Sequence, residues 1–378
     1  RLLWDVGADV GVAEAAALQR DSDEEPGYAY DRKTAFTLYQ QIVAPVARLL
    51  EGKRHIFIAT SGVLTSLPFG IMVTDPPKGD DSDPRAMRAT KWFADAHALT
   101  VVPSIQSLQF LRGRAKGDAS TSSETFVGYG DPQLEGDAQK RGQRSQSTKA
   151  ARSMFNPQAV RAAGAIADVT QIRSMASLPG TAVELENMRI AMGAPRSSVH
   201  VQGDATESAI KGANLATVGI LALATHGLMA GELPGAAEAG LVFTPPPQAS
   251  EQDDGLLTAS EIAGLKLDAE WVILSACNTA AGDGSEGAPG LSGLARAFLY
   301  AGARNLLASH WPVRDDVASQ LTVDTIRLQR ANPALSRAEA LQQAMRSIRN
   351  NSSHDTANDS WAHPNAWAPF SLIGDGAG

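Results

Sequence analysis

The chain has 378 residues, of which 43% are hydrophobic and 20% are charged, the balance of a soluble globular enzyme with room for two lobes. Its net charge of −8 argues against binding of a phosphate backbone as the main activity, so we expect no direct nucleic-acid partner. The sequence has neither a membrane-length apolar run nor a signal-peptide pattern, so we expect no membrane association and no export signal. Because the chain begins with Arg1 rather than Met, we expect it to be part of a longer protein.

The first third of the sequence predicts a small, non-catalytic α/β lobe. It contains a linker, a helix broken by a proline, two short strands and a second helix. These fall at residues 1–30, 32–50 with Pro45 as the break, 55–59, 99–102 and onward from Ser104. A polar stretch at 117–124 marks the boundary, which gives one lobe over residues 31–118 and a larger one over 119–378.

In the larger lobe, strands and helices alternate. Strands are predicted at residues 126–130, 198–201, 218–225, 271–276 and 304–309, and the apolar runs at 218–225 and 271–276 indicate strands that are fully buried. Capping boxes or helical spacing predict helices opened by Thr181 with Glu184, Asp204 with Glu207 and Ser336 with Glu339, and over 291–301 and 316–330. A last strand, expected at a sheet edge, falls at 367–373. This order predicts an α/β fold with an open, mainly parallel sheet and helices on both faces.

Three polar stretches interrupt this pattern, at residues 135–158, 244–255 and 350–360. Their composition cannot supply a core, so we expect mobile surface insertions. The first could also serve as a cleavable or regulatory loop.

The candidate chemistry lies where two neighbouring apolar runs end. One run ends at His226-Gly227, and the other leads into Cys277, the only cysteine of the chain. In parallel α/β sheets such ends meet at one edge, where an imidazole can take the proton of a thiol whose ordinary pKa is near 8.5. The spacing of 51 residues is close to the roughly 50 found in caspases. We therefore predict His226 as base and Cys277 as nucleophile, with the backbone amides of Gly227 and Cys277 as oxyanion donors.

Other readings of these residues remain open. A lone cysteine at a strand end is often a small buried hydrophobe, and a lone histidine is often structural. The chain could also be a regulatory interaction module without turnover, or a different cysteine acyl hydrolase. A single cysteine excludes an internal disulfide and a cysteine-cluster metal site. The histidines lack metal-binding spacings, so we expect no metal and no cofactor. The single cysteine leads us to expect a reducing, cytoplasmic location.

Several motifs, taken together and in order, resemble the CHAT domain family, which is caspase-like and separase-related and belongs to the clan CD cysteine peptidases. The resemblance covers roughly residues 31–375. The motifs are 67–69 (LPF), 102–104 (VPS), 178–181 (LPGT), 222–227 (ALATHG), 274–279 (LSACNT), 293–299 (GLARAFL), 311–313 (WPV) and 367–370 (WAPF).

The resemblance implies a caspase-type endopeptidase with His226 as base and Cys277 as nucleophile, next to a catalytically silent N-terminal lobe. It also implies an activating protein partner or upstream helical repeats, in a bacterial signalling or defence setting. One position departs from the family: His310 stands where an aliphatic residue is usual. His310 could lie beside the dyad, or have a buried or interface role.

Substrate preference is suggested only by acidic residues near the predicted site. These residues could form a pocket for an Arg or Lys side chain before the scissile bond. Separase-like enzymes favour arginine at that position, which supports the pocket by analogy. The acidic residues are Asp283, Glu286, Asp315 and Asp316. Acidic loop residues are more commonly solvated or cap helices, and Asp315 is well placed for capping.

Overall fold

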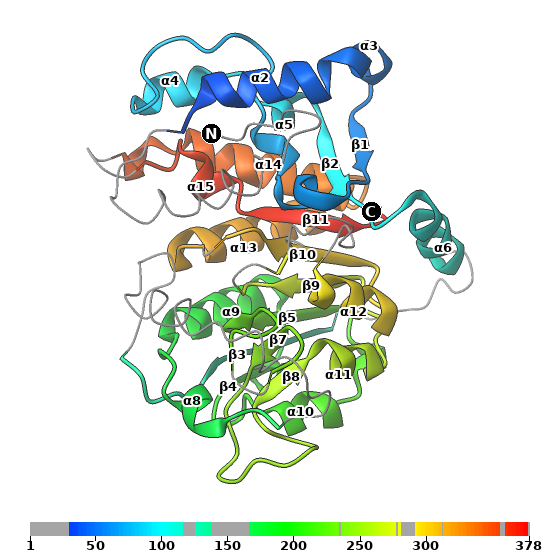
Figure 1. Cartoon of the computed structure of the whole chain (residues 1–378), viewed down its shortest axis with the longest axis vertical. Coiled ribbons are helices and arrows are strands. Elements are labelled where there is room, and N and C mark those ends of the chain that lie inside the picture. Colours follow the sequence, from blue (N-terminus) through cyan, green and yellow to red (C-terminus); the bar gives the residue numbers. More distant parts are fainter. Residues whose placement is uncertain are drawn as a thin grey trace.

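A computed structural model describes residues 30–115, 125–137, 166–233, 236–276, 279–280, 292–311, 313–355 and 360–376. These residues form an eight-stranded sheet with helices on both faces, and a small three-stranded sheet beside it (Figure 1). The order across the large sheet is β1-β2-β11-β10-β9-β5-β3-β4. Its strands are β1 (His55–Ile58), β2 (Ala98–Val101), β3 (Phe126–Pro132), β4 (Val199–Gln202), β5 (Ile220–Ala224), β9 (Trp271–Leu274), β10 (Asn305–Ser309) and β11 (Phe370–Gly374).

The predicted open, mainly parallel sheet is confirmed. Every neighbouring pair of the large sheet is parallel except β10 and β11, which are antiparallel. The small sheet is antiparallel and consists of β6 (Gly227–Leu228), β7 (Gly240–Val242) and β8 (Leu256–Thr258). The order of the elements along the chain therefore predicted the sheet type correctly.

The last strand was predicted at an edge of the sheet, but it does not lie there. β11 lies between β2 and β10, and its residues Leu372 and Ile373 are each 1% exposed. The prediction was wrong because β1 and β2 extend the same sheet past β11, and the lateral order of strands is not written in a local apolar pattern.

Two apolar cores cover the two faces of the sheet, which explains the uninterrupted apolar runs. In β5, Ala222 and Ala224 face one core, whereas Leu221 and Leu223 face the other. The first core includes residues of α2, α9, α13, α14 and α15, and the second includes residues of α10, α11 and α12. The α-helices are α2 (Arg32–Ile42), α3 (Ala47–Leu50), α4 (Pro84–Ala89), α5 (Phe93–Ala96), α6 (Ile105–Ala115), α8 (Val169–Arg173), α9 (Pro179–Met192), α10 (Glu207–Gly212), α11 (Ala259–Gly264), α12 (Gly293–Ala301), α13 (Asp315–Ala331), α14 (Arg337–Asn350) and α15 (Pro364–Trp367).

The helix starts agree with prediction in one case and differ in two. Ser336 and Glu339 form the expected capping box of α14. The helix predicted to open at Thr181 begins two residues earlier at Pro179, because proline suits the first helical position, and Glu184 lies inside it. The cap of α10 is Thr206, whose side chain accepts a hydrogen bond from the Ala209 amide, rather than Asp204.

The N-terminal elements share the sheet with the rest of the chain (Figure 1). The Arg88 guanidinium is 2.5 Å from the Asp355 carboxylate, and Arg349 is 2.6 Å from Asp95. The predicted lobe boundary at 118/119 and the linker over 1–30 lie almost wholly outside the described residues, and both stay predictions. Among the described residues, no helix has the length and apolar character that crossing a membrane requires.

Candidate active site

β5 and β9, which lead into the two predicted catalytic residues, are parallel neighbours. Leu223 pairs with Leu274, and the Ser275 amide donates to the Leu223 carbonyl over 2.9 Å. His226 and Cys277 each stand three residues beyond this pair in the sequence. The structure describes the chain up to Ala276 and again at residues 279–280, so Cys277 lies outside the described residues.

The His226 ring is half-buried and is held by a backbone carbonyl. Its Nε2 atom lies 2.7 Å from the carbonyl oxygen of Ala176, between α8 and α9. A carbonyl oxygen only accepts hydrogen bonds, so Nε2 carries the proton. In the neutral ring Nδ1 therefore holds the lone pair, and it is the nitrogen suited to take a proton.

The carbonyl that holds His226 is itself fixed by the chain after β3. Gly136 and Ala176 form a parallel bridge, in which the Gly136 amide donates to Met175 over 3.0 Å. A Cβ atom at Gly136 would lie 2.5 Å from the Met175 oxygen, so only glycine permits this approach. The position of Ala176 was missed from the sequence because every residue has a carbonyl.

Gly227 begins β6 and lies beside β7, where it pairs with Leu241. The Val242 amide donates to the His226 carbonyl over 3.0 Å, and the Thr225 hydroxyl donates to Val242 over 2.6 Å. The small sheet therefore holds the backbone on both sides of the His226 side chain.

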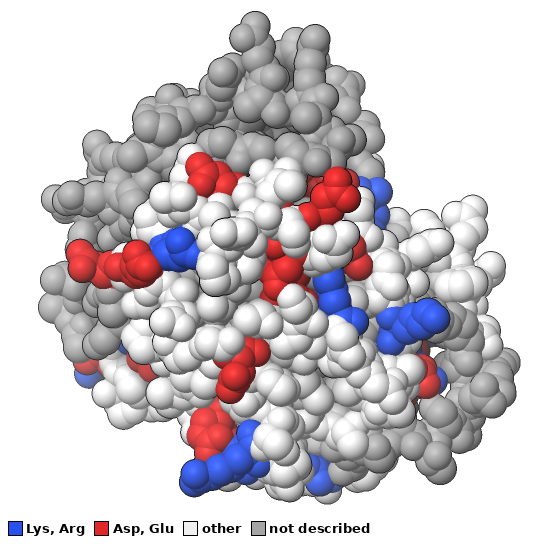
Figure 2. All heavy atoms as spheres, turned by 90° about the horizontal axis from the view of Figure 1, so that it is seen from below, with Lys and Arg blue, Asp and Glu red and all other residues white. Residues whose placement is uncertain are grey.

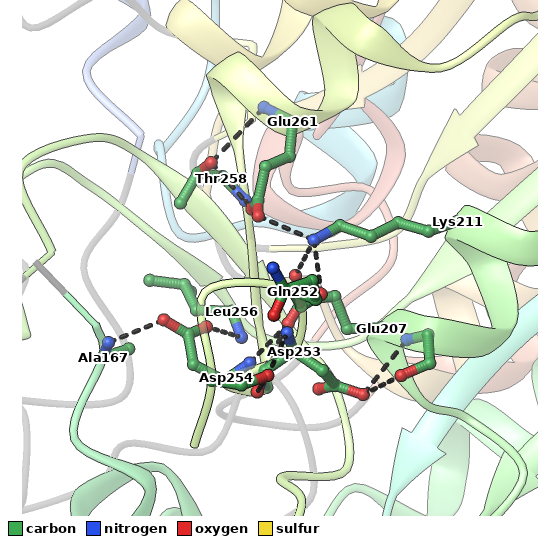
Figure 3. A network of polar contacts seen from close by, with 12 residues as sticks. Ala167, Glu207, Lys211, Gln252, Asp253, Asp254, Leu256, Thr258 and Glu261 are labelled. Carbon is green, nitrogen blue, oxygen red and sulfur yellow. Dashed lines mark hydrogen bonds and ion pairs between the residues drawn. The ribbon is translucent and has the colours of Figure 1, made fainter. Parts of the chain in front are cut away.

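A polar network fastens the loop that joins β7 to β8 (Figure 3). Glu207, 1% exposed, pairs with Lys211 and accepts the amides of Asp254 and Gly255 over 2.9 and 3.0 Å. Lys211 also contacts Glu261 over 2.7 Å. The expectation of a mobile insertion over 244–255 was wrong for its last residues, because Lys211 and the buried Glu207 on α10 bind the backbone of residues 252–255. The network thus supports the small sheet next to His226.

Burial raises the pKa of Glu207 to about 7, although hydrogen bonds from Lys211 and Asp254 act in the opposite direction. The ordinary value is 4.5, so the folded protein holds this proton more tightly than the unfolded chain. The stability contributed by the protonated form is therefore present below about pH 4.5 and is lost as pH rises to about 7. We expect the free energy of unfolding to fall from pH 5 to pH 8 by about 1–2 kcal/mol more in wild type than in Glu207→Gln.

Urea denaturation across this pH range measures the difference. Glu186→Gln serves as the control because the Glu186 carboxylate, 43% exposed, forms an ion pair with Arg189 on α9, and this variant should keep the wild-type pH dependence. The same pH dependence in wild type and Glu207→Gln would contradict the expectation.

The predicted substrate-pocket residues lie partly within the described chain. Asp283 and Glu286 lie outside it. Asp315 and Asp316 form the first turn of α13, with Arg314 rather than Asp315 at the capping position. Burial works against ionisation of Asp316, but the Arg314 guanidinium 2.7 Å away lowers its pKa overall. The Asp315 carboxylate lies against Gly180 at the start of α9.

His310 follows β10 and turns toward β11, the neighbour on the side away from β9. Its Nε2 atom lies 2.7 Å from the Ser371 hydroxyl, and Nδ1 is buried with no partner among the described residues. Burial lowers the pKa of His310 to about 4, so the ring is neutral at physiological pH.

Two strained residues lie at the same edge of the sheet. Asp131 at the end of β3 and Gln202 at the end of β4 have φ angles of 42° and 52°. The Gln202 side-chain amide donates to the Asp131 carboxylate over 2.5 Å, and the Asp131 amide donates to Thr181 over 2.8 Å. Positive φ at non-glycine residues is costly and clusters at functional sites, which supports this edge as the site.

A hollow of about 480 Å³ lies at the opposite edge, where β3, β4 and β5 begin. Its lining includes Thr125, Val127, Gly193 and Asn214. On the face seen from below, acidic and basic side chains lie interspersed among the described residues (Figure 2).

The described residues thus form a mainly parallel α/β sheet in which His226 follows β5, the parallel neighbour of β9. The model of the CHAT domain matches residues 32–375. The chain therefore belongs to the CHAT domain family, and the resemblance found in the sequence motifs is confirmed.

This chain matches only part of the length of each similar protein. Tetratricopeptide repeat protein 28 of Mus musculus is 35% identical over 119 residues, which are 32% of this chain and 4% of that protein. The separase–securin complex of Saccharomyces cerevisiae has a TM-score of 0.41 at 14% identity and covers 85% of this chain and 15% of that one. The complex of RgpB pro- and mature domains of Porphyromonas gingivalis has a TM-score of 0.44 at 8% identity, over 91% and 68%.

Proposed function

We propose that this CHAT domain is a cysteine endopeptidase with Cys277 as nucleophile and His226 as base. One observation carries the proposal: β5 and β9 are paired so that both residues follow the same register position at one edge of the sheet. The bond from His226 Nε2 to Ala176 adds support, because it leaves the basic lone pair on Nδ1.

In the proposed reaction, His226 Nδ1 takes the thiol proton as Cys277 Sγ attacks the scissile carbonyl carbon. The amides of Gly227 and Cys277 stabilise the resulting oxyanion. The C–N bond breaks as His226 returns the proton to the leaving amine, which gives a thioester on Cys277. Water then attacks the thioester carbon as His226 takes one of its protons. The C–S bond breaks, the carboxylic acid leaves, and His226 returns the proton to Cys277 Sγ.

We further propose that the enzyme prefers substrates with Arg or Lys before the scissile bond. The acidic residues that would bind this side chain are Asp283, Glu286, Asp315 and Asp316. The place of α13 after β10 supports this, because its first turn belongs to the same edge of the sheet. We also propose a cytoplasmic setting and control by a protein partner or an upstream domain. The match to a segment of a protein named for tetratricopeptide repeats supports such a neighbour.

Covalent labelling tests the proposal. Peptide acyloxymethyl ketones with arginine, aspartate or leucine next to the warhead are incubated with the chain, and the modified residue is identified by mass spectrometry. We expect modification at Cys277, fastest with arginine, because the warhead requires an activated thiol and the pocket favours a basic side chain.

Cys277→Ala is the control and should take up no label. Equal rates with aspartate and arginine would contradict the basic preference but not the peptidase. No labelling by any peptide, with or without candidate activating proteins, would contradict the peptidase and favour the interaction module.

A further inference from the structure

Ser309, the last residue of β10, binds the chain on both sides of positions 277 and 278. Its hydroxyl donates to the Ala276 carbonyl over 2.5 Å. Its amide donates to the Thr279 hydroxyl over 3.1 Å, and its carbonyl accepts the Ala280 amide over 2.9 Å. Ser309 is only 1% exposed, so water does not compete for these bonds.

Thr279 closes the network from the other side. Its side chain is fully buried, and its hydroxyl lies 3.2 Å from the Ala276 carbonyl, which it can donate to while accepting the Ser309 amide. The Thr279 carbonyl accepts the hydroxyl of Ser292, the residue that caps α12. The Ala276 carbonyl thus lies between two hydroxyl groups that are themselves anchored, one on β10 and one next to α12.

The direction of this carbonyl has a chemical consequence. A peptide unit is planar and almost always trans, so the carbonyl oxygen and the following N–H point in opposite directions. The N–H that shares a peptide unit with the Ala276 carbonyl belongs to Cys277, the amide proposed above as an oxyanion donor. In a planar trans peptide unit, an anchored carbonyl restricts the directions open to the N–H of the same unit.

We propose that Ser309 is a positioning residue that orients the Cys277 amide toward the oxyanion. The inference rests on the proposed cysteine peptidase. Ser309 itself does not touch the substrate, and it acts through the Ala276 peptide unit. An oxyanion donor contributes about 10²–10³ in kcat, so partial loss of its alignment should be measurable.

Ser309→Ala removes the hydroxyl bond but keeps both backbone bonds. With a peptide amide reporter, we expect kcat to fall at least about 10-fold and KM to change less than about threefold. Alkylation of Cys277 by iodoacetamide should change less than about threefold, because displacement of iodide by a thiolate forms no oxyanion. Ser309→Thr restores the hydroxyl and should recover kcat.

Ser198→Ala is the matched control. Ser198 is also buried and donates its hydroxyl to a carbonyl, that of Pro195 over 2.7 Å, but it lies before β4 at the opposite edge of the sheet. Unchanged kcat in Ser309→Ala would overturn the inference, as would equal losses in kcat and alkylation, which would indicate a misplaced thiol.

Hydrogen exchange separates failure of this inference from failure of the proposed function. We expect faster amide exchange over residues 275–280 in Ser309→Ala than in wild type or Ser198→Ala, whether or not the chain cleaves peptides. If wild type neither turns over nor takes up label, the peptidase fails. If exchange in this segment is unchanged, the anchoring by Ser309 fails.

Discussion

His226→Ala is expected to lower the second-order rate constant for labelling of Cys277 by about 10³–10⁴ while the protein remains folded. The change removes the nitrogen that we propose takes the thiol proton, and also the hydrogen bond to the Ala176 carbonyl. The backbone of His226 stays held by Val242, so the free energy of unfolding should change little. The loss is measured by comparing the rates at which the preferred acyloxymethyl ketone labels wild type and His226→Ala as a function of pH.

His97→Ala is a matched control for this change. The His97 ring also bonds a backbone carbonyl, that of Lys53 over 2.6 Å, but it lies between α5 and β2. His97→Ala should label at the wild-type rate. If both variants lose reactivity equally, the effect of His226→Ala is structural, and the assignment of His226 as the base is wrong.

Gly130→Ala is expected to destabilise the fold by about 2–3 kcal/mol. Gly130 pairs with Ala224 in the register of β3 and β5, and a Cβ atom there would lie 2.5 Å from the Ala224 carbonyl oxygen and 2.9 Å from Leu185. This carbonyl belongs to a central strand, so the clash with the added Cβ atom can be relieved only if the two strands move apart. Chemical denaturation measures the change in the free energy of unfolding.

Gly113→Ala offers the same substitution with the opposite expected sign. Gly113 lies in α6, and nothing stands within 4 Å of the added Cβ atom. Alanine in a helix loses less backbone entropy than glycine, so we expect a gain of about 0.5–1 kcal/mol. A Gly130→Ala protein as stable as wild type would contradict the tight approach of β3 to β5.

The sequence was sufficient to predict the mainly parallel sheet and to place the ends of its two informative strands at one edge, whereas their direct pairing is a finding of the structure. Apolar runs before His226 and Cys277 require cover on both faces, and such strands collect at the centre of a parallel sheet. The assignment of His226, Cys277 and Gly227 to catalysis stays a prediction, as does the acidic pocket. These depend on side-chain geometry that includes residues outside the described chain.

What the sequence could not predict are the contacts made by common groups. The carbonyl of Ala176 and the hydroxyl of Ser309 have no distinctive residue type, so no motif announces them. The binding of loop 244–255 by Glu207 depends on an ion pair with Lys211 within α10 and on backbone amides far along the chain. Local composition indicated only that this loop is polar.

The central place of β11 also constrains how the chain folds during synthesis. β1 and β2 are made early, but they join the rest of the sheet only through a strand that ends at Gly374. Until that strand has left the ribosome, β2 and β10 each present an unpaired edge, separated by about 200 residues of sequence. Contacts between segments so distant in sequence close slowly, so the nascent chain has a long interval in which those edges can pair with other molecules.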